Sequence, residues 1–402
     1  TNDGFAVRTA SGRLLDQSKS LSAQGVRAGA ALTLEPLGEG AADMVYDDLT
    51  EAVGQVVERV STPWTREDAR TLAALAAAGL VFVAALLLAT TPPDALTALD
   101  PKGVTRYNFI AGAIGIVAAL LVTATSVVMT RKHPQASGIA LAHSVPFLTA
   151  AAALRLSQSH WDTAGWAWTG LGLLIGSLAV LTLTKRYRIS IAAPLVVGTV
   201  LAATGLLVRL GQLSQAGVSA ILFALMIVLL QVAPWIALAH IPVRILDADT
   251  TEQIPAKGIT DQVSTSFVFV VALRSGGAIA ALFLTVSLMT APEPRSVSLP
   301  LTLIMLGAVS LVLQTRSIRA RVEVLLGALT GLVVILVATV LSAYKDPRMM
   351  PWLTLAAIAT ALVLVVTNVV GPRARPHLTR IADTISVLSL FVLLPLAVYL
   401  WS

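Results

Sequence analysis

The fold is decided by stretches such as residues 216–239, which read AGVSAILFALMIVLLQVAPWIALA and contain no charged side chain. A helix needs roughly 20 apolar residues to cross the hydrocarbon core of a bilayer, and this stretch is long enough. The whole chain shares its character, because 56% of its 402 residues are hydrophobic and 12% are charged. Soluble globular proteins carry about 25% charged residues. The sequence therefore predicts a polytopic α-helical membrane protein.

Eleven stretches of the chain have this apolar character, including the one quoted. They are residues 71–90, 109–130, 136–154, 164–183, 189–208, 216–239, 267–290, 297–313, 324–343, 352–370 and 381–400. Lipid offers no hydrogen-bond partner to a free backbone, and the alternation typical of membrane β-strands is missing, so each stretch is expected to be a helix. We therefore predict a transmembrane domain of about 11 helices over residues 71–402.

The basic residues of the connecting loops predict the orientation of these helices. Lys and Arg concentrate in cytoplasmic loops of membrane proteins. The loops after the even-numbered stretches hold 13 basic residues, and the loops after the odd-numbered stretches hold 7. The N-terminal region is therefore expected in the cytoplasm. Because the number of stretches is odd, the C-terminus is expected on the opposite side.

Two polar side chains inside the apolar stretches are candidate functional groups. Arg274 is the only charged residue well inside a stretch, and an intramembrane charge is a functional hypothesis by default. The favoured interpretation is that its side chain snorkels to the cytoplasmic interface, about two turns away. His143 lies in the middle of its stretch. A proton relay and a hydrogen-bonded packing role are both open for it, and packing is favoured.

Two amide residues and two glycine pairs are expected to serve the packing of the helices, and two acidic residues lie near the ends of stretches. Gln231 and Asn368 are predicted to form hydrogen bonds between helices, whereas Glu323 and Asp383 lie near cytoplasmic ends and are expected to be half solvated. The glycine pairs at four-residue spacing, which indicate close helix crossings within one bundle, are Gly172 with Gly176 and Gly327 with Gly331.

The motifs of catalysis and metal binding are missing from the sequence. There is no Cys, no GxxxxGK[ST], HExxH or GxSxG, and the five His include no pair at metal-ligand spacing. The basic residues are scattered between apolar runs, which argues against nucleic-acid binding. We therefore predict no enzyme activity, no cofactor and no metal.

Two other classes of protein remain open as alternatives. A secondary transporter of a small or lipidic substrate would suit the number of helices. However, no acidic residue lies at the centre of a stretch, where ion-coupled transporters place carboxylates. A polyprenyl-dependent membrane enzyme would need acidic or metal-binding loops. The acidic residues of the predicted outer loops form no close pair.

Residues 1–36 form a domain of short strands in this interpretation. The segments 5–8 and 13–15 flank the turn signal Ser11-Gly12 and are expected to pair as a hairpin, and a third strand is expected over 31–35. Three short strands bury too little apolar surface to be stable alone. We therefore expect either a further part of the domain before residue 1 or a partner that covers the strands.

Residues 37–70 are predicted to be a linker followed by an amphipathic cytoplasmic helix. The apolar side chains of Tyr46, Leu49, Val53 and Val56 recur at helical spacing, and the neighbouring acidic residues Asp47 and Asp48 lie on another face. An acidic face disfavours contact with anionic lipid, so this stripe is interpreted as a docking surface for a protein. The loop at 240–266, the longest after the first stretch, is the second candidate for docking.

The order of these parts resembles a known family. The segments Gly12-Arg13-Leu14-Leu15-Asp16, Gly25-Val26-Arg27-Ala28-Gly29 and Leu32-Thr33-Leu34 look like the C-terminal half of a ubiquitin-like (β-grasp) domain. The sequence Tyr46-Asp47-Asp48-Leu49, a cytoplasmic helix and eleven spans follow. Together they resemble EccD, the multi-span membrane subunit of the type VII (ESX) secretion system.

This resemblance implies a scaffold. Members of the EccD family form homodimers whose spans enclose a lipid-filled space, and their ubiquitin-like domains contact the FtsK/SpoIIIE-type ATPase subunit EccC and help join it to EccB and EccE. For this chain the resemblance implies a multi-pass protein of the bacterial inner membrane, with a cytoplasmic N-terminal domain and a periplasmic C-terminus. It offers no catalytic residues.

Overall fold

The computed structural model divides the chain into two compact units, Thr1–Arg66 and Glu67–Ser402, which are described separately. In the first unit the structure describes residues 4–9, 14–15, 21, 24, 26 and 32–37. Beyond residue 65 it describes 66–90, 101–132, 136–159, 161–183, 188–239, 256–292, 297–315, 320–355, 358 and 375–401.

The first unit contains a three-stranded antiparallel sheet with the strand order β2-β1-β3. Its strands are β1 (Gly4–Thr9), β2 (Leu14–Leu15) and β3 (Leu32–Leu37). In the register of the sheet, Val7 of β1 lies opposite Leu15 on one side and Leu34 on the other. The strands therefore lie where the alternation of apolar residues predicted them. The helix predicted near residues 44–60 lies outside the described residues.

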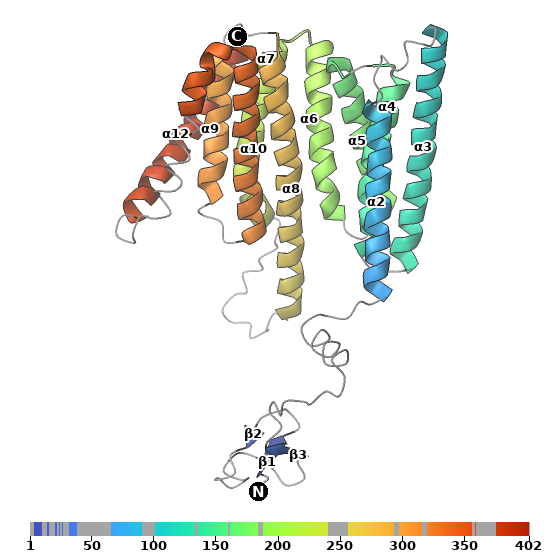
Figure 1. Cartoon of the computed structure of the whole chain (residues 1–402), viewed down its shortest axis with the longest axis vertical. Coiled ribbons are helices and arrows are strands. Elements are labelled where there is room, and N and C mark those ends of the chain that lie inside the picture. The colour runs from blue at the N-terminus through green and yellow to red at the C-terminus, as the bar shows by residue number, and fades with distance from the viewer. Residues whose placement is uncertain are drawn as a thin grey trace, which may run out of the picture. The chain divides into compact units, whose positions relative to one another are not determined.

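The second unit is a bundle of helices that stand side by side (Figure 1). Its first half contains α2 (Arg66–Thr90), α3 (Pro101–Lys132), α4 (Ala136–Leu156), α5 (Thr163–Leu183), the 3₁₀ turn η2 (Arg188–Ile191) and α6 (Ala192–Arg209). Its second half contains α7 (Gln215–Ala239), α8 (Ala256–Thr290), α9 (Ser298–Gln314), α10 (Arg321–Lys345), the 3₁₀ turn η4 (Pro347–Met349) and α12 (Arg375–Trp401).

Within the described part, nine helices are long and apolar enough to cross a membrane. The helix α9 is apolar but has 17 residues, which corresponds to about 26 Å at 1.5 Å per residue. These ten helices coincide with ten of the eleven predicted stretches. The stretch predicted at 352–370 lies mostly outside the described residues. The chain is therefore a multi-pass helical membrane protein.

Several helices begin earlier than predicted, and the largest difference is at the start of α8. The segment 240–266 was expected to be a loop, but α8 begins at Ala256, so the last part of that segment is helical. Its polar residues carry no apolar pattern that would mark a helix. Once α8 has formed, however, each added residue gains a backbone hydrogen bond without a new nucleation cost. Residues 240–255 lie outside the described part.

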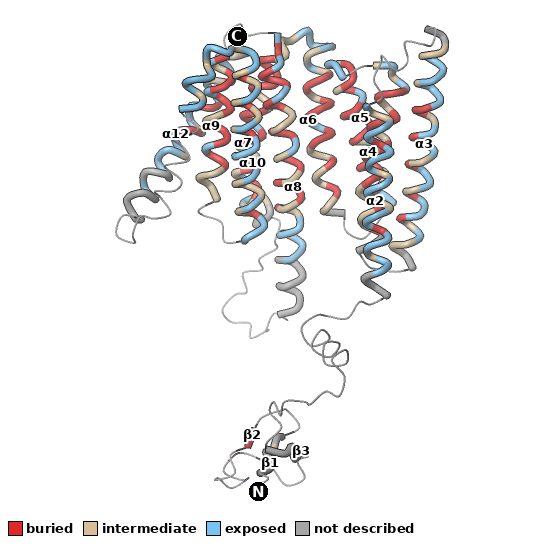
Figure 2. Tube along the Cα trace, in the orientation of Figure 1, coloured by how far each residue is buried: buried red, intermediate tan, exposed pale blue. Residues whose placement is uncertain are grey.

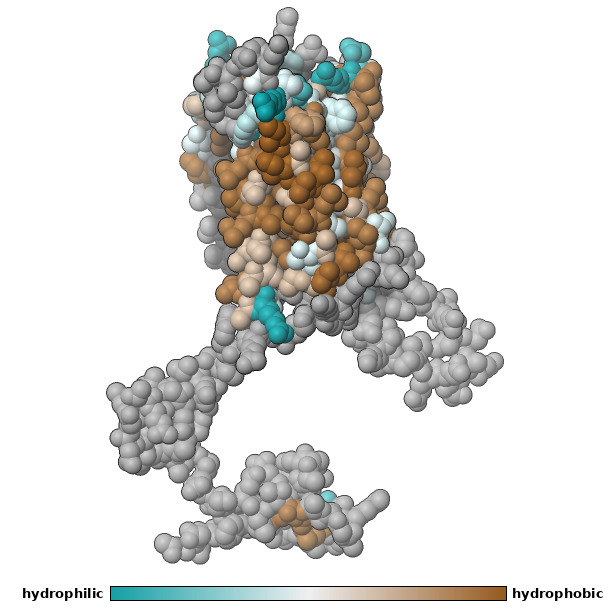
Figure 3. Space-filling model, turned by 90° about the vertical axis from the view of Figure 1, so that its right-hand side faces the viewer, coloured by the Kyte–Doolittle hydropathy of each residue, from teal (hydrophilic) through white to brown (hydrophobic). Residues whose placement is uncertain are grey.

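The core of the bundle lies between its inner helices, and the outer helices expose apolar side chains. The side chains of Phe223 on α7, Leu284 on α8, Leu303 on α9 and Leu393 on α12 are fully buried and belong to the largest apolar cluster. In contrast, 11% of the span of α2 and 17% of the spans of α10 and α12 are buried (Figure 2). Figure 3 shows the resulting band of hydrophobic side chains on the visible face of the bundle. This band is typical of a surface that faces lipid or another membrane protein.

Glycine residues bring neighbouring helices into close contact. A methyl group on Gly172 of α5 would lie 2.5 Å from the carbonyl oxygen of Thr149 on α4, and one on Gly176 would lie 2.7 Å from Cα of Pro146. A methyl group on Gly331 of α10 would lie 2.9 Å from the carbonyl oxygen of Ala308 on α9. The glycine pairs therefore mark helix crossings within one bundle, as predicted.

Candidate functional site

Polar side chains from four neighbouring helices gather at one end of the bundle, and we call them the four-helix polar cluster. Its members are Gln231 of α7, Arg274 of α8, Ser310 and Gln314 of α9, and Glu323 of α10. The sequence places them together because α7 and α9 end, and α10 begins, at this end of the bundle (Figure 1). The helix α8 starts beyond it, so Arg274 lies about 27 Å along its own helix from Ala256.

An ion pair links α8 and α10 within this cluster. The atom Nη1 of Arg274 lies 3.6 Å from Oε2 of Glu323, and the side chains are 5% and 12% exposed. Two sequence predictions were therefore wrong: the guanidinium of Arg274 is buried instead of exposed to solvent, and Glu323 is not half solvated. The reason is the packing of α8 against α10, which puts the first turn of α10 beside the guanidinium. A buried charge requires such a partner.

Amide side chains link α7 and α9 in the same cluster. The amide Nε2 of Gln231 donates a hydrogen bond to the hydroxyl oxygen of Ser310. The amide Nε2 of Gln314 donates to the backbone carbonyl of Gln231 over 3.0 Å. The prediction that Gln231 joins two helices is therefore confirmed. The second residue of that prediction, Asn368, lies outside the described residues.

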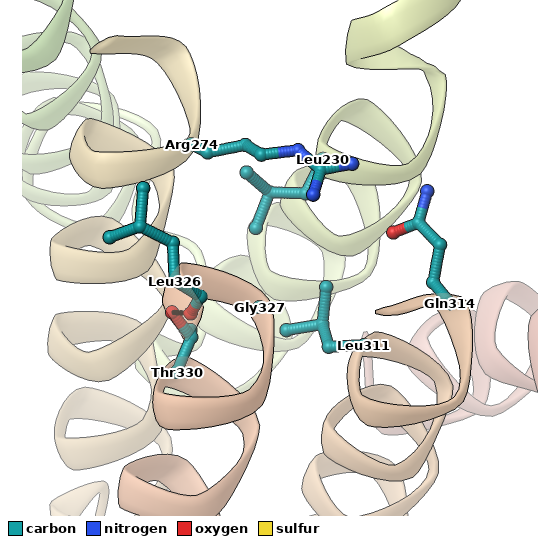
Figure 4. A pocket seen from close by; sticks show the side chains of 7 residues that line it. All are labelled: Leu230, Arg274, Leu311, Gln314, Leu326, Gly327 and Thr330. Carbon is teal, nitrogen blue, oxygen red and sulfur yellow. Dashed lines mark hydrogen bonds between the residues drawn. The ribbon is translucent and has the colours of Figure 1, made fainter. Parts of the chain in front are cut away.

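A small pocket lies beside the ion pair and the amide pair (Figure 4). It is lined by Leu230, Arg274, Leu311, Gln314, Leu326, Gly327 and Thr330. Figure 4 shows the side chain of Arg274 extending along this space toward Gln314. The pocket therefore borders one member of each polar pair of the cluster.

Two further basic residues bind the carboxyl ends of neighbouring helices. The ammonium group of Lys345, in the last turn of α10, donates to the carbonyl oxygen of Ala291 over 2.8 Å and to that of Met289 over 3.3 Å. Arg155, in the last turn of α4, donates to the carbonyl oxygen of Leu88 on α2 and to the side chain of Asn108 on α3. Cations stabilise helix ends because the last carbonyls lack intrahelical partners. Because both residues were assigned to connecting loops, the sequence did not indicate that they bind helix ends.

His143 has a local hydrogen bond on α4. Its Nδ1 lies 2.8 Å from the carbonyl oxygen of Ile139, one turn earlier on the same helix, and the residue is half-buried. Among the residues that the structure describes, no group of three or more His, Cys, Asp or Glu side chains is placed to hold a metal ion. The geometry thus gives His143 a packing contact.

The predicted docking surface stays a prediction, because the structure does not describe its residues. Tyr46, Asp47, Asp48, Leu49, Val53 and Val56 lie outside the described residues. Asp383, expected to be half solvated, is exposed on α12. Of the polar groups that the structure does describe, those that gather make contacts between helices, and such contacts fix helix positions.

Comparisons with known proteins agree with this architecture. A family model described as the EccD-like transmembrane domain matches residues 69–402. A solved structure described as protomer 1 of the ESX-3 core complex is 18% identical with a TM-score of 0.63, and the match covers 100% of this chain and 91% of that chain. The MycP5-free ESX-5 inner membrane complex, state II, contains a chain that is 17% identical with a TM-score of 0.62, covering 92% of this chain and 87% of that chain. No protein with a curated description matches. At these identities the structural likeness shows a shared fold.

Proposed function

The chain belongs to the EccD family, and from this premise we propose that it is a structural membrane subunit of a type VII protein secretion complex. The observation that carries the proposal is the family match, which spans the bundle from residue 69 to residue 402. The fold shared with chains of the ESX-3 core complex and the ESX-5 inner membrane complex supports it. We place the protein in the bacterial inner membrane, with its N-terminal region in the cytoplasm and its C-terminus in the periplasm.

In this proposal the bundle acts as a scaffold, and a partner ATPase supplies the energy for export. The four-helix polar cluster supports this role, since its side chains tie helices together. The largely exposed apolar helices α2 and α12 offer surfaces for lipid, for other membrane subunits and for a second copy of the chain. We accordingly propose that the protein forms a homodimer and has no enzymatic activity of its own.

The N-terminal part is proposed to dock the cytoplasmic partners. We divide the chain into a partial ubiquitin-like domain at 1–36, a linker and amphipathic helix at 37–70, and the transmembrane domain at 71–402. The antiparallel order β2-β1-β3 supports a small sheet domain that needs a covering partner. The proposed partners are an EccC-like ATPase of the FtsK/SpoIIIE type, EccB and EccE.

The proposal is tested by purifying the tagged full-length protein from its native membrane in mild detergent and quantifying the proteins that accompany it by mass spectrometry. We expect one large complex that contains an FtsK-like ATPase and single-span membrane subunits. Recovery of the chain alone as a single species would refute the scaffold role and favour a transporter.

A pair of tyrosine variants tests the docking surface in the same experiment. We expect Tyr46→Ala to reduce the ATPase recovered per copy of the chain. The control Tyr344→Ala removes an 88% exposed tyrosine in the last turn of α10 and should leave the recovery unchanged. Equal recovery with both variants would contradict docking through residues near 46.

A further inference from the structure

The guanidinium of Arg274 has hydrogen-bond donors that the ion pair does not use. Its contact with Glu323 is made through Nη1. The atoms Nε and Nη2 are fully buried, and among the described residues neither has a hydrogen-bond partner. Buried donors without partners are rare in proteins, because each loses its bonds to water on burial. The pocket described above borders the same guanidinium group, so a small occupant there is the nearest candidate partner for these donors.

The adjacent pocket has the size and lining of a site for one water molecule. It leaves about 10 Å³ for the centre of a water molecule, which is close to the minimum for a single one. Besides Arg274, its polar lining residues are Gln314 and Thr330. The hydroxyl of Thr330 donates to the carbonyl of Leu326, and a hydroxyl oxygen also accepts hydrogen bonds. A water molecule here thus has both a donor and an acceptor within its walls.

Anionic ligands fit this pocket poorly. Its space leaves room for about one water-sized centre, whereas a phosphate or carboxylate group has three or more heavy atoms. The carboxylate of Glu323, which already faces Nη1 of Arg274, neutralises the guanidinium and repels a second anion. Size and charge therefore both favour a neutral ligand with a single heavy atom.

We propose that this pocket is a binding site for one ordered water molecule, which accepts hydrogen bonds from Arg274 and donates to Thr330 or Gln314. The water joins the ion pair of α8 and α10 to the amide pair of α7 and α9. The four-helix polar cluster then becomes one continuous network. Since α8 begins beyond the ends of the neighbouring helices (Figure 1), the network fixes the helix that follows residues 240–255 in the sequence. This site stands independently of the proposed secretion partners.

The water is tested by X-ray radiolytic labelling of the purified full-length protein in ¹⁸O water, which oxidises side chains beside ordered water. Leu230 and Leu311 line the pocket and are each 4% exposed. Leu284 and Leu303 are fully buried in the apolar core and serve as matched controls. We expect labelling of Leu230 and Leu311 several-fold above that of the controls. Equal, background labelling of all four leucines would overturn the proposal.

Two variants connect the labelling to the polar lining. Arg274→Met keeps an unbranched side chain but removes the donors, so labelling of Leu230 and Leu311 should fall to the level of the controls. Thr330→Val keeps the shape of the side chain and removes the hydroxyl, and it should lower the labelling even if Arg274→Met fails to fold. Unchanged labelling in Thr330→Val together with unchanged labelling in folded Arg274→Met would refute the site. Thermal stabilisation by added phosphate that Arg274→Met abolishes would also refute it, because the ligand would then be an anion.

Discussion

Removing one member of the buried ion pair is expected to destabilise the bundle substantially. In Glu323→Gln the guanidinium of Arg274 stays 5% exposed but loses the charge that faces it at 3.6 Å. At an effective dielectric constant of about 20, the attraction across this distance is about 5 kcal/mol. Part of it is offset by the cost of burying both groups, and removal of one partner from a buried pair typically costs about 3–5 kcal/mol. We expect the free energy of unfolding to fall by about 3 kcal/mol.

The double variant distinguishes the ion pair from a general packing effect. Arg274→Met with Glu323→Gln removes both charges, so no unpaired charge remains buried. The double variant should therefore lose about 2 kcal/mol less than the sum of the two single variants, since side chains in direct contact show coupling energies of this order. The assay is reversible unfolding of the purified protein in mixed detergent micelles, followed by helical circular dichroism.

A matched control completes this cycle. Asp383 is an exposed acidic residue on α12, and Asp383→Asn should change the free energy of unfolding by less than about 0.5 kcal/mol. Additivity of the two single variants to within about 0.5 kcal/mol would refute the argument that Arg274 and Glu323 stabilise each other. The same loss in Asp383→Asn as in Glu323→Gln would show a general effect of removing acidic charge.

Three further predictions concern packing, helix ends and orientation. Gly172→Ala should lower the thermal unfolding temperature, because its methyl group would lie 2.5 Å from a backbone oxygen of α4. The control Gly79→Ala should leave this temperature unchanged, because no atom lies within 4 Å of the corresponding position on α2. Equal effects of the two variants would contradict the close crossing of α4 and α5. Lys345→Met should lower the free energy of unfolding by about 1 kcal/mol, because the carbonyl contacts at the end of α8 are lost. Lys345→Arg keeps the positive charge and should show only a small part of this loss. An unchanged free energy of unfolding in Lys345→Met would refute the stabilising contact. Because the chain has no Cys, a single introduced cysteine reports on which side of the membrane it lies. Tyr344→Cys should react with an impermeant maleimide added from the periplasm, whereas Asp383→Cys should react only after the membrane is opened. The reverse pattern would show that the proposed orientation is wrong.

The helices could be predicted from the sequence because the bilayer imposes a length and an apolar composition on each of them. Stretches such as 216–239 end within a residue or two of the observed α7. The strands near Val7 and Leu15 were also predictable, because alternation and a turn signal are local features. The polar starting segment of α8 was not, since nothing in its composition marks a span.

The partners of the polar residues could not be predicted, because they depend on which helices are neighbours. Arg274 and Glu323 are separated by a whole helix and two connections in the sequence. Without the contact between α8 and α10, a snorkelling arginine and a half-solvated glutamate are the reasonable expectations. Arg155 likewise counts as a loop cation until its contact with the carboxyl end of α2 is known. Hydropathy gives the positions of spans along the chain and carries no information on their neighbours.

Contacts at both ends of α10 hold it against α8 and argue that these two helices move as one body. In the first turn of α10, Glu323 pairs with Arg274 from the middle of α8, and in the last turn Lys345 binds the carbonyls of Met289 in α8 and of Ala291 directly after it. Along α8 these two contacts are about 24 Å apart, so a sliding motion of one helix against the other would break both. Alternating access in transporters rocks one rigid bundle of helices against another, so any such motion would have to carry α8 and α10 together. Between them, two contacts at different levels fix one helix relative to the other, and a scaffold needs such a fixed surface for its partners.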